Sequence, residues 1–229
     1  MSKPTIKVVI PAFNEENSVG KVVREIPRSL VSEVVVVNNA STDATRASAE
    51  AAGATVIDEP RKGYGQACLT GLAYLRNQSP PDIVVFLDAD YSDYPEEMTK
   101  VVEPILANQA DLVIGSRATG QRQQGSMTVP QVFGNWLATN LLKLFYRVKF
   151  TDLGPFRAIR WDSLEALNMQ DTNYGWTVEM QLKAAKKKLR CTEVAVDYRK
   201  RIGKSKVSGT VKGTLMAGYK ILWTIFRYL

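Results

Sequence analysis

Two aspartates spaced two residues apart, Asp88 and Asp90, directly follow an apolar run at residues 83–87. Carboxylates in this arrangement at the end of a buried strand aim at one hard cation and at an adjacent ribose. Mg2+ and Mn2+ both prefer oxygen ligands and bridge the oxygens of a diphosphate, so either ion fits the pair. Because an isolated Asp-x-Asp pair is common in unrelated proteins, its position after a strand carries the argument. Asp93, which comes shortly before Pro95, is instead typical of a turn.

The elements that must position these aspartates are short β-branched runs with helical stretches between them, at residues 6–10, 34–37, 55–57, 83–87 and 112–114. This alternation predicts βαβ units and a mainly parallel sheet, and runs without a polar face indicate strands covered on both sides. With 229 residues, 45% of them hydrophobic, the chain fits one α/β domain with a substantial core. In such a sheet ligands bind beyond the carboxyl ends of the strands, where this chain has Pro11, Asn14, Glu15, Asn38, Asn39, Ser41, Asp43, Ser116 and Arg117.

The composition excludes several classes of site. The chain has no histidine, which rules out imidazole bases, Ser-His triads and His-ligated zinc. Its two cysteines, Cys68 and Cys191, are too few and too far apart for a disulfide framework, and they suit a reducing interior. The sequence has no Gly-rich phosphate loop of the dinucleotide-binding or P-loop type. A nucleotidyltransferase would carry an early Gly-rich loop with Arg or Lys, and residues 11–16 contain none.

The charge of the chain is positive and uneven. The formal net charge of +7 attracts anions, and by itself it does not choose among nucleic acid, anionic lipid headgroups and phosphorylated small molecules. Basic residues crowd the stretch between Lys183 and Lys206, where the acidic residues are Glu193 and Asp197. We therefore expect an anion to dock on the C-terminal third of the chain.

The two ends of the chain carry different signals. Residues 1–7 lack the apolar core of a secretory signal, and no run of 18 uncharged apolar residues occurs, so we expect neither export by that route nor a membrane span. Residues 210–229 are apolar but interrupted by Lys212, Lys220 and Arg227, which predicts an amphipathic C-terminal helix after a domain at residues 1–209. The pattern leaves three partners open for this helix: a membrane surface, the core of the domain, or another subunit in a homodimer.

Four segments occur in an order and spacing that resemble a known family. They are residues 9–15 (VIPAFNE), 39–43 (NASTD), 87–90 (LDAD) and 115–117 (GSR), and they are similar to the successive motifs of glycosyltransferase family 2. Residues 152–157 (DLGPFR) and 201–206 (RIGKSK) resemble segments of its dolichyl-phosphate mannosyltransferase and polyprenyl-phosphate glycosyltransferase branch. The resemblance implies the GT-A fold, a Rossmann-like nucleotide-diphospho-sugar transferase with three α/β/α layers and a mainly parallel central sheet.

The resemblance also implies roles for individual residues. On the donor side, the nucleotide pocket would be lined by Pro11, Asn14, Glu15, Asn39, Asp43, Asp88 and Ala89. Asp90, assisted by Asp88, would ligate Mg2+ or Mn2+. Arg117 would face the acceptor, and a loop with Arg201, Ser205 and Lys206 would close over the phosphates. Amide and carboxylate pairing of Asn39 and Asp43 with a base edge is chemically sensible, and uracil and guanine both stay open as the donor base.

The predicted function is inverting transfer of a hexose from a GDP-mannose or UDP-glucose type of donor to a polyprenyl or dolichyl phosphate. An anionic phosphate acceptor needs no general base. A hydroxyl acceptor, as in polysaccharide or glycolipid synthesis, is the alternative, and its proton would pass to Asp152 or Glu179. A non-catalytic protein that binds anionic membranes is a further alternative, which leaves Asp88 and Asp90 unexplained. We expect a nucleotide-diphosphate sugar and a lipid phosphate as partners, no nucleic acid, and a cytoplasmic location with peripheral contact to the cytoplasmic membrane face left open.

Overall fold

The computed structural model describes residues 3–203, 205 and 210–229, and its central element is a seven-stranded sheet. The strands are β1 (Ile6–Ala12), β2 (Glu33–Asn38), β3 (Thr55–Asp58), β4 (Ile83–Phe86), β5 (Leu112–Ser116), β6 (Arg157–Arg160) and β7 (Cys191–Ala195). The helices are α1 (Val19–Glu25), α2 (Thr45–Ala51), α3 (Tyr64–Asn77), the 3-10 helix η1 (Pro95–Glu97), α4 (Met98–Leu106), α5 (Val129–Tyr146), α6 (Trp161–Leu167), α7 (Trp176–Lys186) and α8 (Val211–Arg227).

The strands follow the order β3-β2-β1-β4-β6-β5-β7. β1 pairs in parallel with β2 and β4, and β5 pairs in parallel with β7. In the described part of the chain, β6 alone runs antiparallel to its neighbours, β4 and β5. All five strands predicted from the β-branched runs are confirmed as β1 to β5, and the carboxyl ends of the parallel strands meet at one edge of the sheet.

The sequence patterns did not predict β6 and β7, for two physical reasons. β6 begins and ends with arginine, and its first residue, Arg157, is fully buried because its guanidinium donates to the carbonyl oxygens of Leu153, Gly154 and Thr177. β7 lies at the edge of the sheet, and its residues are half-buried or exposed, so it lacks a continuous apolar run. Both strands are therefore defined by tertiary pairing.

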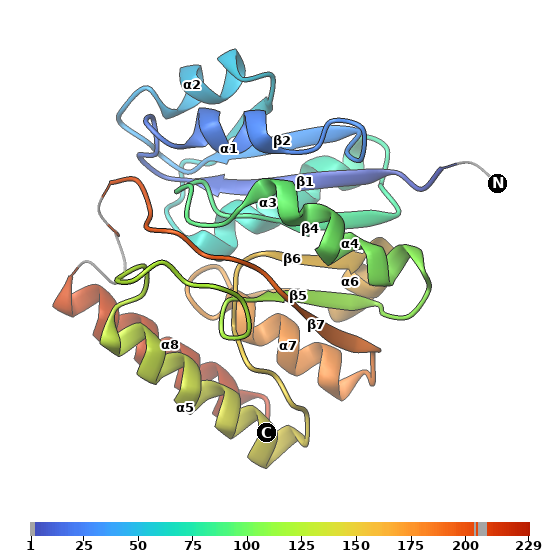
Figure 1. Cartoon of the computed structure of the whole chain (residues 1–229), viewed down its shortest axis with the longest axis vertical. Helices are drawn as coiled ribbons and strands as arrows, with labels where there is room; N and C mark the ends of the chain where they lie inside the picture. The colour runs from blue at the N-terminus through green and yellow to red at the C-terminus, as the bar shows by residue number, and fades with distance from the viewer. Residues whose placement is uncertain (1–2, 204, 206–209) are drawn as a thin grey trace.

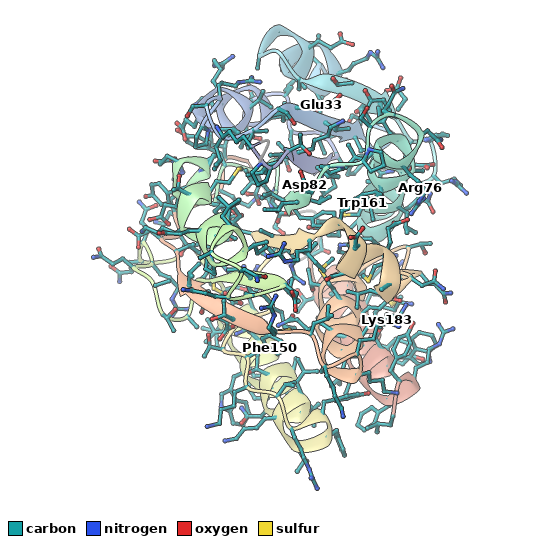
Figure 2. The ribbon with its side chains drawn as sticks, turned by 90° about the vertical axis from the view of Figure 1, so that its right-hand side faces the viewer. Glu33, Arg76, Asp82, Phe150, Trp161 and Lys183 are labelled. Carbon is teal, nitrogen blue, oxygen red and sulfur yellow. The ribbon has the colours of Figure 1, made fainter. Side chains whose placement is uncertain are left out.

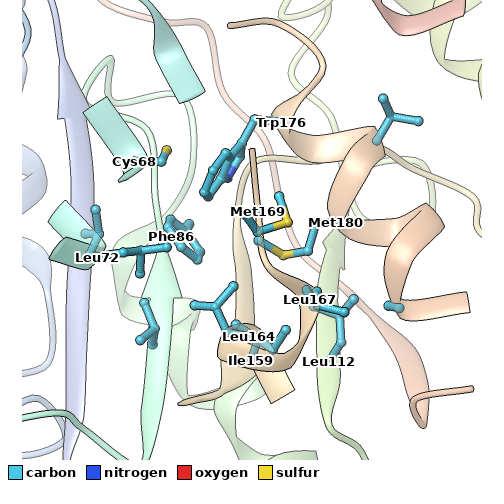
Figure 3. Packing of buried hydrophobic residues seen from close by; sticks show 14 of the residues in the cluster. Cys68, Leu72, Phe86, Leu112, Ile159, Leu164, Leu167, Met169, Trp176 and Met180 are labelled. Atoms are coloured by element: carbon cyan, nitrogen blue, oxygen red, sulfur yellow. The ribbon is translucent and has the colours of Figure 1, made fainter. Parts of the chain in front are cut away.

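Helices cover both faces of the sheet, which gives the three α/β/α layers expected from the sequence (Figure 1). On one face α1, α2 and α4 enclose a core with Ile10, Val36 and Val85. On the other face α3, α6 and α7 pack over alternate residues of the same strands, including Phe86. There the ring of Phe86 meets Trp176 edge-on at a centroid distance of 5.8 Å, in a cluster with Cys68, Leu72, Met169 and Met180 (Figure 3).

The strands of the sheet end on two opposite sides of the molecule, and Asp88 and Asp90 lie on only one of them. Figure 2 faces the edge where Glu33 begins β2, Asp82 precedes β4 and Trp161 follows the antiparallel β6. At that edge the Trp161 amide donates to the Asp82 carbonyl oxygen at 2.9 Å, so the strand ends are tied to one another. Asp88 and Asp90 belong to the opposite edge, beyond the carboxyl end of β4.

The long helices α5 and α8 lie side by side below the sheet (Figure 1). Phe145 and Phe226 stack edge-on with their centroids 5.7 Å apart, and the Tyr146 hydroxyl donates to the Ile225 carbonyl oxygen at 2.8 Å. Ile225 is fully buried. The C-terminal segment predicted as a helix is thus helical, and one of its faces packs on the body of the protein.

Candidate active site

Asp88 and Asp90 stand where the chain leaves the core after β4. Phe86 and Leu87 are fully buried, and Asp88 is the first residue after them that is partly exposed. One Asp88 carboxylate oxygen accepts a hydrogen bond from the Tyr64 hydroxyl at 3.0 Å. One Asp90 oxygen accepts the Ser92 amide at 2.9 Å, which folds the chain back after the strand. Both carboxylates are therefore held in place at the carboxyl edge of the sheet.

The two aspartates open onto a cavity of about 320 Å³. Its wall contains six residues that the sequence assigned to donor binding or to the metal: Pro11, Glu15, Asn39, Asp88, Ala89 and Asp90. Arg201 completes the predicted set in this wall, and the residues that the sequence did not single out include Phe13, Lys62, Tyr64, Asn173 and Tyr174. Strand ends, the start of α3 and the approach to α7 meet here, which is where an open α/β sheet binds its ligands.

Arg201 connects two of the acidic residues of this cavity. One guanidinium nitrogen lies 3.0 Å from an Asp90 oxygen, and the other lies 2.7 Å from an oxygen of Glu15. Glu15 is itself buried, and its second oxygen accepts a hydrogen bond from Ser18 at 2.8 Å. The backbone supports this contact, because the amide of Ile202 donates to the Asp90 carbonyl oxygen at 2.9 Å. A fixed positive charge thus lies between the carboxylates from β1 and β4.

The donor set suits a divalent cation that is shared with a diphosphate. Among the described residues no group of three or more His, Cys, Asp or Glu side chains is arranged to hold a metal by itself. Mg2+ is commonly bound through one or two carboxylates, with substrate phosphates and water as the other ligands. The Asp90 carboxylate already binds a cationic group, because the Arg201 guanidinium lies 3.0 Å from it. Asp88 and Asp90 therefore fit Mg2+ or Mn2+.

The environment of Asp88 makes its ionisation sensitive to ligands. Loss of hydration and repulsion from Asp90 raise the pKa of Asp88 to about 7, against the opposing effects of the Tyr64 hydrogen bond and of Arg201. Neutral and ionised forms of this carboxyl are consequently close in free energy near pH 7. A cation that binds beside it favours the ionised form.

Arg117 and Asp152 form a buried ion pair. The guanidinium makes two parallel hydrogen bonds to the carboxylate, at 2.7 and 2.8 Å, and the Arg117 amide adds a third at 2.8 Å. Burial opposes ionisation of Asp152, but Arg117 outweighs it and lowers the pKa of the carboxyl. The Tyr198 ring also lies under Arg117, with 5.0 Å between the guanidinium carbon and the ring centroid. Asp152 is thereby a weak base, and its contacts position Arg117.

Asp93 differs from its sequence interpretation. The turn interpretation required its side chain to bond nearby backbone, but both carboxylate oxygens are buried and have no hydrogen-bond partner in the described part of the chain. The following 3-10 helix has Tyr94 at its N-cap and no side-chain cap. Burial, and next the charge of Asp88, raise the pKa of Asp93 well above its usual range. The turn explanation is wrong, because this carboxyl is buried without a partner among the described residues and its surroundings oppose its ionisation.

Several predicted donor residues shape the cavity through its loops. The Asn39 side chain bonds the backbone of Glu59, Arg61 and Gly63, so its amide is used to hold that loop. Asn14 joins the two loops after β1 and β2, because its amide oxygen accepts the Thr42 N–H at 2.8 Å and its own N–H donates to Ser41 at 3.0 Å.

The remaining predicted residues fall outside the lining of this cavity. The Asp43 carboxylate accepts the amides of Thr45 and Glu16, so its contact with the base stays a prediction. Ser205 is described and half-buried and does not belong to the lining. Lys206 lies outside the described residues.

Lys62, Tyr64, Asn173 and Tyr174 are among the cavity residues that sequence reasoning missed. For Lys62 and Tyr64 the sequence did contain a signal, because the glycines on either side of Tyr64, Gly63 and Gly65, indicate a close contact of the backbone. A side chain at Gly63 or Gly65 would place its Cβ atom 2.2 Å from the carbonyl oxygen of Thr172 or 2.0 Å from that of Asp171. These glycines allow the start of α3 to touch the segment before α7, and this contact brings Asn173 and Tyr174 to the cavity.

Glu179 does not line the cavity at Asp88 and Asp90. It is fully buried in the first turn of α7, where it pairs with Lys183 at 2.7 Å and accepts the backbone amides of Gln170 and Asp171. The hypothesis that it serves as a general base is wrong, because all of these contacts belong to the packing of α7.

A second cavity, of about 410 Å³, lies between α5 and the segment at residues 149–152. Its walls are both basic and apolar, with Arg122, Lys143, Lys149, Met127, Val132, Trp136 and Phe150. Asp152 also lines it, so the Arg117–Asp152 ion pair forms part of its wall. An amphiphile with an anionic head matches such a lining.

Comparison with known proteins places these observations in a family. The sequence model of the family described as "Glycosyl transferase family 2" matches residues 7–167, which is more than half of the chain. The chain belongs to glycosyltransferase family 2. Within this family it is 36% identical, over 95% of its own length and 96% of the relative, to an uncharacterised glycosyltransferase of Mycobacterium tuberculosis.

Two other relatives have more specific names. An undecaprenyl-phosphate mannosyltransferase of Micrococcus luteus is 28% identical over 91% of this chain and 89% of the relative. A low-salt glycan biosynthesis hexosyltransferase of Haloferax volcanii is 31% identical over 92% of this chain and 51% of the relative. The chain is thus a glycosyltransferase.

The fold is that of the GT-A glycosyltransferases. Glucosyl-3-phosphoglycerate synthase from Mycobacterium tuberculosis, solved with Mn2+, UDP-glucose and phosphoglyceric acid, superimposes with a TM-score of 0.77 over 98% of this chain and 79% of that chain, at 23% identity. Among the residues that the structure describes, we find no helix with the length and hydrophobicity needed to traverse a membrane.

Proposed function

We propose that this chain transfers a hexose, with inversion, from a nucleotide-diphosphate sugar of the GDP-mannose or UDP-glucose type to a polyprenyl or dolichyl phosphate. The observation that carries the proposal is a cavity beyond the carboxyl end of β4 that is lined by Asp88, Asp90 and Arg201, with Arg201 paired to Asp90. A diphosphate leaving group requires carboxylates that hold a cation and a guanidinium that binds phosphate oxygens. The cavity provides both.

Donor binding would depend on both the acidic and the basic side chains of this cavity. Asp90 and Asp88 would hold Mg2+ or Mn2+, and when bound the cation neutralises charge on the departing diphosphate. Lys62 adds a second positive charge to the wall, and its ammonium lies 4.9 Å from the centroid of the Phe13 ring. Asn39 keeps the loop behind Lys62 in place through its bonds to backbone. The wall is then organised before the donor arrives.

The second cavity supports an amphiphilic phosphate as the acceptor. Arg122, Lys143 and Lys149 supply positive charge for a phosphate, and the apolar residues of the same wall suit the first units of a lipid chain. The undecaprenyl-phosphate mannosyltransferase among the relatives agrees with this class of acceptor. The synthase with the same fold was solved with phosphoglyceric acid, so a small phosphorylated acid is the comparison that an assay must include.

The chemical step needs little proton transfer. An acceptor phosphate oxygen would bond to the anomeric carbon while the bond from that carbon to the diphosphate breaks, and the electron pair leaves with the nucleoside diphosphate. Arg201 stabilises the charge that grows on the leaving group, and such stabilisation is often the largest catalytic contribution. Asp152 holds Arg117 toward the acceptor side through two hydrogen bonds. No general base is required, which agrees with the lowered pKa of Asp152.

We propose further that the protein works as a peripheral protein on the cytoplasmic face of a membrane. A lipid acceptor must be met at the bilayer surface, and the cavity proposed for it is bordered by α5, whose residues Phe133 and Trp136 are exposed. A tryptophan beside basic side chains is typical of segments that lie in the headgroup region.

Thermal unfolding with nucleotides tests the donor assignment. A nucleotide that binds only the native protein, at about 100 times its Kd, adds about 2.7 kcal/mol, which raises the Tm of a chain of this size by about 5 to 10 °C. We expect UDP, GDP or their sugars to give this shift only with Mn2+, and we expect Asp90→Asn to lose the metal-dependent part. If no nucleotide gives a metal-dependent shift in the wild type, the proposal is refuted.

A transfer assay tests the acceptor. With labelled donor, we expect the label to enter the organic phase when polyprenyl phosphate is supplied and to stay in water when phosphoglyceric acid is supplied. The reverse result would keep the donor assignment and overturn the lipid acceptor.

A further inference from the structure

One wall of the donor cavity is a short segment between α6 and α7, at residues 170–175. Asn173 and Tyr174 of this segment line the cavity. The segment is seated on the start of α3, because the Gln66 amide donates to the Thr172 carbonyl oxygen at 2.9 Å. Gly65 allows this close approach, since a Cβ atom there would lie 2.0 Å from the Asp171 carbonyl oxygen. A shift of the segment therefore changes the wall of the cavity directly.

The C-terminal helix α8 holds this segment from behind. The Lys220 ammonium pairs with Asp171 at 3.0 Å, and the Asp171 side chain in turn accepts the amides of Asn173 and Gly175. The Tyr228 hydroxyl donates to Glu179 at 2.9 Å, and Glu179 also accepts the amide of Asp171 at 2.8 Å. The contacts from Lys220 in α8 and from Tyr228 directly after it thus end on groups that fix the backbone of residues 170–175.

The outward side of α8 is apolar and exposed, and it continues onto α5. We define the apolar face as the exposed residues Phe133, Trp136, Leu144 and Phe145 of α5 with Leu215, Met216, Tyr219, Trp223 and Phe226 of α8. Figure 1 shows the two helices side by side along one margin of the molecule. Exposed aromatic and aliphatic side chains in this number are unusual on a protein surface that has no partner.

The charge around the apolar face selects its partner. Residues 112–151 and 198–229, which contain both helices, have no Asp or Glu. Basic residues accompany the apolar ones in these segments, among them Lys143, Arg147, Lys149, Lys212, Lys220 and Arg227. Two copies of such a surface would repel each other, whereas an anionic lipid surface attracts it at about 1 kcal/mol per basic residue close to the headgroups.

We propose that the apolar face binds an anionic lipid surface and that α8 couples this contact to the donor cavity, so that lipid and nucleotide sugar strengthen each other's binding. Lipid contact holds α8 in the orientation in which Lys220 and Tyr228 support residues 170–175. Because coupling between two binding sites is reciprocal, a bound donor must strengthen lipid binding by the same factor. The proposal rests on the proposed function only in requiring that the cavity binds a nucleotide sugar.

Titration calorimetry on the full chain tests the coupling. The donor sugar nucleotide that stabilises the wild type is titrated with Mn2+ in buffer, with phosphatidylcholine vesicles, and with vesicles that contain phosphatidylglycerol. We expect the anionic vesicles to tighten donor binding about fivefold or more, the lower end of common allosteric couplings. Neutral vesicles should leave the affinity unchanged.

Variants separate the lipid contact from its transmission. Tyr228→Phe and Asp171→Asn leave the apolar face and its basic residues intact, so both should still sediment with anionic vesicles while the gain in donor affinity is lost. Leu215→Ser with Met216→Ser should abolish sedimentation and keep the donor affinity measured in buffer. Leu106→Ser removes an exposed leucine from α4 and is the matched control that changes neither property.

Three results would overturn the proposal. The coupling is refuted if the wild-type protein binds anionic vesicles and its affinity for the donor stays unchanged. It is also refuted if anionic vesicles raise the donor affinity of Tyr228→Phe as much as that of the wild type. A doubled mass in light scattering that the Leu215→Ser and Met216→Ser changes abolish would show that a second copy covers the apolar face. Absence of nucleotide binding under every condition would instead refute the proposed function. In that case, sedimentation of the wild type with anionic vesicles would still show whether the apolar face binds lipid.

Discussion

Arg201 allows a prediction in which two properties change in opposite directions. Its guanidinium pairs with Asp90, the proposed metal ligand, at 3.0 Å and with Glu15 at 2.7 Å. A metal ion that binds to Asp90 must replace the first of these contacts, while the leaving diphosphate gains from the positive charge of the guanidinium. Arg201→Gln should therefore strengthen metal binding and slow sugar transfer.

The magnitude follows from the burial of the pair. Three quarters of the Arg201 side chain is buried, and Asp90 and Glu15 are about nine-tenths buried, with exposures of 25%, 10% and 9%. A hydrogen bond between charged groups contributes about 1.5 to 3 kcal/mol. Loss of the competing contact on Asp90 should tighten Mn2+ binding in the absence of nucleotide by about tenfold or more. Removal of one donor that stabilises transition-state charge commonly slows turnover about 10²- to 10³-fold.

Two measurements on the same protein preparation check this prediction. The fraction of free Mn2+, measured by electron paramagnetic resonance during titration of nucleotide-free protein, gives the metal affinity. Initial rates with the preferred donor give kcat and KM. Lys200→Gln is the control, because it removes one positive charge from an exposed neighbour and leaves Asp90 untouched.

Mn2+ affinity and turnover should change in opposite directions in Arg201→Gln, so a change of both in the same direction refutes the prediction. If Arg201→Gln weakened Mn2+ binding as well as catalysis, Arg201 would be holding the carboxylates in the geometry for the metal. If Lys200→Gln reproduced the gain in metal affinity, general electrostatic attraction would explain the result and the contact with Asp90 would not.

Three further predictions concern the pair of aspartates and its support. Because only ionised Asp88 assists the cation and its pKa is about 7, Mn2+ affinity should rise about tenfold from pH 6 to pH 8, and Asp88→Asn should remove this rise in calorimetry. Tyr64→Phe removes a hydrogen bond that favours ionised Asp88, so the midpoint of the same pH profile should move upward; a downward shift would contradict this. Asp152→Asn leaves the buried Arg117 unpaired and should lower the free energy of unfolding in urea by about 3 to 5 kcal/mol, whereas a loss below 1 kcal/mol would mean that the pair is not a structural support.

Local patterns in the sequence predicted a large part of the fold. Apolar β-branched runs predicted β1 to β5, because strands covered on both faces need apolar residues at every position. The same runs located Asp88 and Asp90 at a strand end, where a parallel sheet binds ligands. The motifs also predicted that Glu15 and Arg201, far apart in the chain, serve one site, and the structure brings them into contact.

The rest of the fold depended on pairing between distant segments. β6 enters the sheet between β4 and β5 in the antiparallel direction, and its arginines gave no apolar run to indicate a strand. Arg157 can be buried only because its guanidinium donates hydrogen bonds to three carbonyl oxygens. No local sequence pattern predicts that these oxygens lie close to it. Asp93 was misread for the same reason, since its sequence neighbours resemble a turn and the surrounding packing buries it.

The sequence by itself determined the chemistry of this protein: the types of the charged residues, their order along the chain, and the strand ends on which the two aspartates stand. Only the tertiary structure decided which of these groups meet. It placed Asn173 and Tyr174 in the donor wall, made Asp152 the partner of Arg117, and gave α8 one face on the protein and one face outward. The physical reason is that periodicity reports what a segment must bury, while the identity of its partner depends on how all the segments pack together.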